Sequence, residues 1–127
     1  IDLHVEVTPV SFDQMTADRK AESSEEIRNR VIVAREIQKE RFKEATSVYH
    51  NAMMPSQMVK QVCKINAAGK TLLKTDMEKL GLSARAYDRI LRVARTISDL
   101  AESEEIKIEH IAEAIQYRSL DREGWAG

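Results

Sequence analysis

The stretch Gly81–Leu100, GLSARAYDRILRVARTISDL, decides the fold of this 127-residue chain. Ser83 is a candidate helix N-cap, because its hydroxyl can accept a hydrogen bond from a free N–H of the first turn. Apolar residues then recur at helical spacing at Ala86, Ile90, Val93, Ile97 and Leu100, and Leu91 and Ala94 widen the stripe. So wide an apolar face predicts the central helix of a bundle, ending near Glu102.

Three further helices are predicted before this stretch. Ser23 and Glu26 have the spacing of a capping box, which places a long helix from there to about 42–46. Its apolar stripe consists of Ile27, Val31, Ala34 and Ile37. A loop at 47–54 precedes a short helix with Pro55 in its first turn, and Asn66 caps a helix that ends before Gly81.

The two ends of the chain carry different patterns. Residues 108–119 predict a last helix, and residues 121–127 a frayed tail. The head IDLHVEV alternates apolar and polar residues, which indicates a strand. Because the chain offers no second strand to pair with it, we expect this strand to be disordered here. The predicted organisation is an orphan strand and flexible linker at 1–22, an all-α bundle of about five helices at 23–120, and the tail.

Composition narrows the function classes. The 20 basic and 21 acidic residues argue against the basic excess of a general nucleic-acid binder, although a local basic patch stays open. The single cysteine, Cys63, excludes an intramolecular disulfide and is expected to be a small buried residue in a reducing compartment. His4, His50 and His110 are dispersed, so no metal site is predicted. Without a membrane-length apolar run or a signal peptide, a cytoplasmic location without membrane contact is expected.

Catalytic motifs are missing from the chain. Gly69-Lys70-Thr71 resembles the end of a phosphate-binding P-loop, but the first glycine and the preceding strand are absent. The tripeptide lies in a helical pattern, and a helix interior cannot wrap its N–H groups around phosphate. No Ser/His/Asp arrangement stands out either. The chain by itself is therefore predicted not to be an enzyme.

The informative cluster is a row of arginines. Arg85, Arg89 and Arg92 lie at i, i+4 and i+7 and form one basic stripe. One interpretation is a solvated face with ion-pair partners, and the same pattern predicts Asp88–Arg92 and Arg95–Asp99 pairs on the outside of the helix. The other interpretation is a phosphate contact by Arg85, which lies in the first turn, where free N–H groups favour anions.

Two stretches carry a family resemblance. GLSARAYDRILRVARTISDL and the later HIAEAIQYRSLDR resemble the C-terminal domain of the Mg-chelatase-like AAA+ ATPases of the competence-protein type (ComM, YifB). The head IDLHVEV, the segment EIRNRVIVAREIQKERF and Asn51-Ala52-Met53 match as well, so the resemblance covers residues 1–122. It implies that the bundle is the helical lid of such an ATPase, that IDLHVEV is a late strand of its core, and that Arg85 is the sensor 2 arginine.

The resemblance also implies cofactors and partners. ATP and Mg²⁺ belong to the full-length protein, and none is expected in this fragment, whose own affinity for ATP should be very weak. The expected partners are the ATPase core of the same chain and neighbouring subunits of a ring, with DNA left open and the fragment itself monomeric. Two alternatives remain: the lid of a true magnesium chelatase, and a stand-alone helical interaction module. A P-loop encoded upstream would exclude the second alternative.

Overall fold

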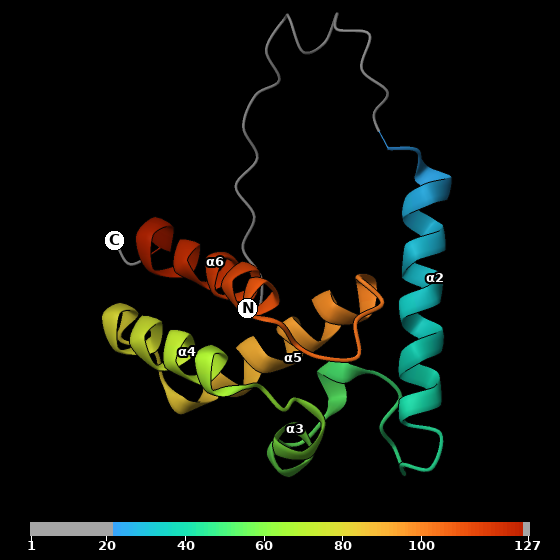
Figure 1. Ribbon diagram of the computed structural model, residues 1–127, viewed down its shortest axis with the longest axis horizontal. Coiled ribbons are helices and arrows are strands. Elements are labelled where there is room, and N and C mark those ends of the chain that lie inside the picture. Colours follow the sequence, from blue (N-terminus) through green and yellow to red (C-terminus); the bar gives the residue numbers. More distant parts are fainter. Residues whose placement is uncertain (1–21, 126–127) are drawn as a thin grey trace, which may run out of the picture.

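The computed structural model describes residues 22–125, with side chains through Tyr117, and this range is entirely helical (Figure 1). The elements are α2 at Ser24–Arg41, the 3₁₀ turn η1 at Asn51–Met53, α3 at Ser56–Val62, α4 at Ala67–Leu80, α5 at Ala84–Leu100 and α6 at Ile108–Trp125. The predicted all-α bundle of five helices is confirmed over the described range. The predicted strand at 1–7 and most of the predicted linker lie outside it.

Helix α5 is the centre of the bundle. It packs against α6, α2, η1 and α3, while α4 lies beside α6 (Figure 1). Helix α2 stands to one side and crosses the C-terminal end of α5. The central position predicted from the wide apolar face of α5 is therefore confirmed.

The predicted helix caps are confirmed by their hydrogen bonds. The side chains of Ser23, Asn66 and Ser83 each accept from the backbone N–H of the third residue of the helix, in α2, α4 and α5, at 3.1, 2.8 and 3.3 Å. Gly81 ends α4 with a left-handed φ of 65°, a conformation that glycine adopts without a Cβ clash. Local sequence signals therefore determine where these helices begin and end.

Three boundaries differ from the prediction. Pro55 is the N-cap residue of α3 and so lies just before the first turn. The predicted loop at 47–54 contains the turn η1, which is held by side chains from distant helices. Helix α6 continues past the predicted end at Ser119 to Trp125. None of the described helices is long and apolar enough to cross a membrane.

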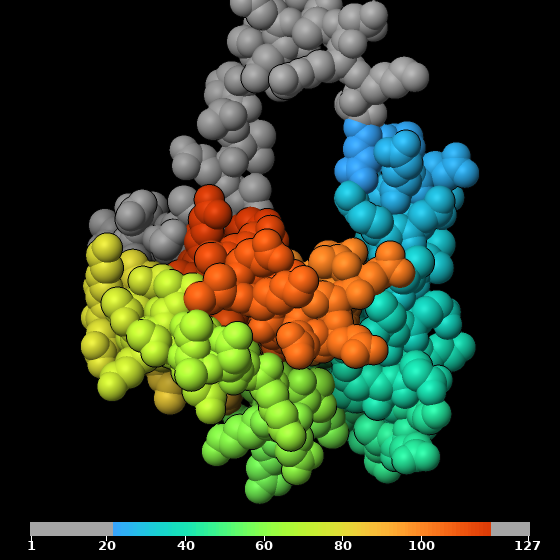
Figure 2. All heavy atoms as spheres, viewed as in Figure 1, coloured from blue at the N-terminus to red at the C-terminus, as the bar shows by residue number. Residues whose placement is uncertain are grey.

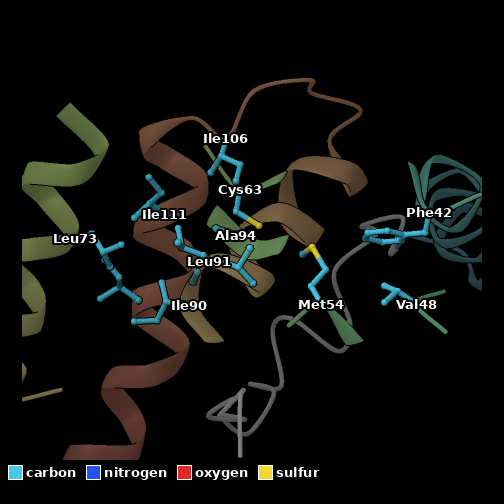
Figure 3. Close-up of a cluster of buried hydrophobic side chains, with 13 residues drawn as sticks. Phe42, Val48, Met54, Cys63, Leu73, Ile90, Leu91, Ala94, Ile106 and Ile111 are labelled. Atoms are coloured by element: carbon cyan, nitrogen blue, oxygen red, sulfur yellow. The ribbon is translucent and has the colours of Figure 1, made fainter. Parts of the chain in front are cut away.

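The core is a continuous aliphatic cluster (Figure 3). It extends from Leu73, Ile90 and Ile111, all fully buried, past Cys63 to Phe42 beside α2. Each large buried aliphatic side chain stabilises the fold by roughly 1.5–3 kcal/mol relative to exposure. Leu100, predicted to be part of the apolar stripe of α5, is 37% exposed because it lines an open groove at the end of that helix.

Helices α4 and α6 pack closely at Gly69. A Cβ at this position would lie only 2.7 Å from Cδ1 of Ile111, well inside van der Waals contact. Glycine lowers helix stability by about 1 kcal/mol relative to alanine. Here its missing side chain is what allows the two helices to approach, which explains a glycine in the middle of a helical pattern.

Candidate functional site

The candidate site is the first turn of α5, where Arg85 lies. Ser83 caps this turn through the N–H of Ala86, and other N–H groups of the turn face outward without intrahelical partners. The Arg85 side chain is exposed, and the described residues provide it with neither a hydrogen bond nor an ion pair. An always-charged guanidinium next to a helix N-terminus favours an anion at this end of the domain.

The predicted arginine stripe divides into parts with different surroundings. Arg92 donates from Nε and Nη to the carbonyl oxygen of Met54, at 3.0 and 2.8 Å, and so holds the end of η1 against α5. The predicted ion pair between Asp88 and Arg92 is wrong, because Asp88 instead accepts from the hydroxyl of Ser56 at 2.6 Å. Arg89 is half-buried between these positions and also has an interaction partner. Only Arg85 of the three is exposed.

The Arg95–Asp99 pair exists, at 3.1 Å, but its predicted place on the outside of the helix is wrong. Arg95 is 5% exposed and Asp99 1% exposed. The Asp99 carboxylate also accepts two hydrogen bonds from Arg41 at 2.7 and 2.8 Å, and one from the amide of Asn51 at 2.8 Å. Helix α2 and the turn η1 cover this face of α5. The Arg95–Asp99 pair, whose spacing is typical of a helix surface, is therefore part of a buried polar centre with Arg41 and Asn51.

Asn51 connects the parts of this polar centre. Its backbone N–H donates to the Gln38 side chain at 2.9 Å, and its amide donates to Thr96 at 3.0 Å. Its side-chain amide oxygen, Oδ1, accepts from Arg41 at 2.9 Å. Sequence reasoning missed this network as a whole. The i,i+4 spacing of Arg95 and Asp99 predicted one pair of the network, and Asn51 itself was marked only by the family resemblance at Asn51-Ala52-Met53.

Arg95 closes the other side of the same centre. Its guanidinium donates to the carbonyl oxygens of Ser103 and Glu104, at 2.7 and 2.9 Å, in the loop after α5. Burial lowers the pKa of Arg95, and the neighbouring Asp99 carboxylate opposes this by favouring the charged form. Because the network joins α2, η1, α5 and the following loop, its role is to hold the elements together.

Other candidate groups are structural. The Gly69-Lys70-Thr71 tripeptide lies in the first two turns of α4, and Thr71 donates to the Ala67 carbonyl one turn earlier at 3.0 Å, so the predicted helical placement of the tripeptide is confirmed. Burial raises the pKa of the Cys63 thiol to about 11, which keeps it protonated and a poor nucleophile. His110 accepts from the N–H of Lys107 at 3.0 Å at the start of α6.

No group of three metal-ligating side chains comes together among the described residues. An open groove lies between the end of α4 and the start of α5, lined by Lys70, Lys74, Met77, Glu78, Gly81, Leu82 and Tyr87. Arg85 is not part of that lining.

The described residues thus form an all-helical domain that exposes an arginine, Arg85, at the start of its central helix. The chain matches the family model described as "Magnesium chelatase, subunit ChlI C-terminal" over residues 21–118, and it belongs to this family. It is 42% identical over 123 residues to the competence protein ComM of Haemophilus influenzae, covering 95% of this chain and 23% of that protein. It is 41% identical over 101 residues to the YifB protein of Escherichia coli, covering 80% of this chain and 19% of that protein.

These comparisons confirm the resemblance inferred from the sequence. The chain is a magnesium-chelatase C-terminal domain of the kind found in ComM- and YifB-like proteins. It spans less than a quarter of the length of the curated relatives named here. Most of each relative therefore lies outside the part that this chain matches.

Proposed function

We propose that this domain is the helical lid of an AAA+ ATPase and that Arg85 is its sensor 2 arginine. The observation that carries the proposal is the contrast within α5. Arg92 and Arg95 are engaged in holding the fold, whereas Arg85 is exposed in the first turn without a partner among the described residues. A position that the fold does not use, yet that carries a fixed positive charge at a helix N-terminus, suits an anionic ligand from outside the domain.

The chemistry fits the γ-phosphate of ATP. A guanidinium can donate two parallel hydrogen bonds to phosphate oxygens, and it stabilises the charge that develops during phosphoryl transfer. The preceding ATPase core would supply the P-loop and the Mg²⁺ ligands. In this mechanism ATP draws the lid toward the core through Arg85, and hydrolysis releases the contact. Because α5 is the central helix, its movement carries the rest of the domain with it.

The partners follow from this role. They are the ATPase core of the same polypeptide and the neighbouring subunits of a ring. The name of the Haemophilus influenzae relative, a competence protein, supports a role for the full-length protein in DNA processing. The family description supports the alternative of a lid from a true magnesium chelatase. With ATP and Mg²⁺ present in both assays, faster ATP hydrolysis by the full-length protein with DNA than with protoporphyrin favours the first role.

The test is ATP turnover of the full-length protein carrying Arg85→Ala. We expect turnover to fall by about 100- to 1,000-fold, the range for removing one charge-stabilising donor. Arg28→Ala is the matched control, since Arg28 is an exposed arginine on α2, and it should leave turnover unchanged. Unchanged turnover and unchanged nucleotide affinity in Arg85→Ala would sink the proposal.

The isolated domain gives a second test. One arginine cannot replace a P-loop, so the domain alone should bind ATP only very weakly. Titration of ATP while observing backbone amide resonances near Arg85 measures this. Saturable binding in the micromolar range would show a nucleotide site that the lid role does not need.

A further inference from the structure

The apolar stripe of α2 is covered at one end of the helix and open at the other. The predicted stripe residues Ile27, Val31 and Ala34 follow one another at helical spacing on one side, and the polar Gln38, not Ile37, continues the buried side. Ala34 and Gln38 are buried against the rest of the domain, with 3% and 7% exposure. Ile27 and Val31 are 44% and 40% exposed, and residues 24–33 are exposed throughout. Figure 2 shows this first half of α2 projecting beyond the bundle.

The open half of the stripe is one wall of a groove. Opposite it lie Ile97 and Ala101 and the 37% exposed Leu100, at the end of α5. Both walls carry apolar side chains, with Arg30 as the charged residue on the α2 wall, and the groove is open to solvent between α2 and α6 (Figure 2). Contiguous exposed apolar surface between helices indicates a binding surface, and an amphipathic helix is the ligand shape that such a groove fits.

The charge at the rim of the groove is negative. Glu109 and Glu113 of α6 line it, and the one lining guanidinium, Arg30, is already paired with Glu22 at 3.0 Å. The groove therefore favours a segment whose apolar side is flanked by lysine or arginine. Within the described residues nothing covers these walls.

The lengths of the relatives indicate where that segment lies. The chain covers 23% of the Haemophilus influenzae protein, and the family description places the matched part at the C-terminus. The preceding portion of such a protein would enter α2 from its open end. A segment of the same polypeptide has a higher effective concentration at this groove than a separate protein would.

We propose that the groove between α2, α5 and α6 binds a basic amphipathic helix of the preceding ATPase core in the same polypeptide. This rests on the proposed function for the existence of that core. It adds a second contact between lid and core, at the opposite end of α5 from Arg85, which does not depend on nucleotide.

The test is site-specific photo-crosslinking in the full-length protein. A benzophenone amino acid replaces Val31, and in a matched control it replaces Glu36, which is exposed on another side of the same helix. We expect Val31 to crosslink within one polypeptide to a helix preceding this chain, with or without ATP, and Glu36 to give at most a tenth of that yield. Glu109→Lys combined with Glu113→Lys should lower the Val31 yield at least three-fold.

The outcomes separate the possible occupants. The proposal is overturned if Val31 crosslinks to residues 1–127 of this chain or gives a product with the mass of two polypeptides. It is also overturned if the two positions give equal yields or if no crosslink forms. Thermal unfolding of the isolated domain shows whether the two charge reversals leave it folded. Loss of ATP turnover is not a readout here, so this docking and the sensor role of Arg85 can fail independently.

Discussion

Arg85 and Arg95 lie on the same helix with similar local sequence, yet their surroundings are opposite. Arg85 is exposed in the first turn of α5, whereas Arg95 is buried in its fourth and shares Asp99 with Arg41. The i,i+4 spacing places Asp99 after Arg95 and Arg89 after Arg85, but it does not show which of the two arginines is buried. The difference comes from α2 and η1, which pack over the last turns of the helix and leave its first turn uncovered. Packing by distant segments therefore decides which arginine serves the fold.

The largest loss of stability is expected when the Asp99 charge is removed, because Asp99 pairs with Arg41 and Arg95 at the buried C-terminal end of α5. Asp99→Asn leaves the Arg41 and Arg95 guanidiniums facing a neutral amide, at a cost of roughly 3–5 kcal/mol in the free energy of unfolding. Urea denaturation of the domain, followed by circular dichroism, measures it. Asp88→Asn on the same helix is the control, because its one hydrogen bond to Ser56 is exposed, and it should cost less than about 1 kcal/mol. Equal losses in the two variants would contradict the contrast.

The pKa of the Cys63 thiol reports whether water is excluded from the core near Arg41, Arg92 and Arg95. Three guanidiniums, those of Arg95, Arg41 and Arg92, lower its pKa, yet burial outweighs them and raises the pKa from 9.0 to about 11. Between these values the unfolded chain ionises the thiol and the native protein does not. Stability should therefore fall as pH rises through this window, by up to about 2 kcal/mol from this group.

The measurement is the difference in unfolding free energy between wild type and Cys63→Ala at pH 8 and at pH 10.5. The subtraction removes the titration of lysines and tyrosines common to both proteins. The variant should lose stability more slowly than wild type over this range. Parallel pH profiles would mean that water reaches the thiol.

Arg92 lies between the two ends and should have an intermediate effect. Arg92→Ala removes two hydrogen bonds to the Met54 carbonyl, and we expect a loss of about 1–2 kcal/mol. Hydrogen exchange should show faster opening at Met53 and Met54, whose N–H groups close the turn η1. Protection unchanged at η1 would show that Asn51 alone holds the turn.

The smallest effect on stability is expected at the exposed end. Arg85→Ala should change the unfolding free energy by less than about 0.5 kcal/mol, since surface substitutions without partners are nearly neutral. The same substitution should have the large effect on ATP turnover described above. If Arg85→Ala lowers the unfolding free energy of the isolated domain by several kcal/mol, Arg85 stabilises the fold as Arg92 and Arg95 do.

Most of the fold could be predicted from short-range sequence patterns, namely helix caps and apolar periodicity. Ser23, Asn66 and Ser83 were identified as caps because capping depends only on neighbouring residues, and the wide apolar face of α5 determined its central place. The buried polar centre could not be predicted in the same way. The i,i+4 spacing of Arg95 and Asp99 is identical on a surface and in an interior, and only the tertiary position of α2 distinguishes them.

The candidate site shows the same limit. Periodicity alone placed Arg85, Arg89 and Arg92 in one stripe and could not rank them. The first-turn position made Arg85 the candidate for a phosphate contact, the family resemblance implied its sensor 2 role, and the exposure of this side chain is consistent with that choice. Asn51 had no pattern of its own, because its partners Gln38, Thr96 and Asp99 come from two other helices.

The bond between Arg41 and Asp99 has a consequence for the order of folding. It joins residues 58 positions apart, whereas α5 and α6 are consecutive helices connected by a short loop. Contacts between distant positions carry a larger loop-closure entropy, so local pairs form earlier. Helix α2 should therefore dock last, onto an already assembled α5–α6 hairpin, and Asp99 should affect the unfolding rate more than the folding rate.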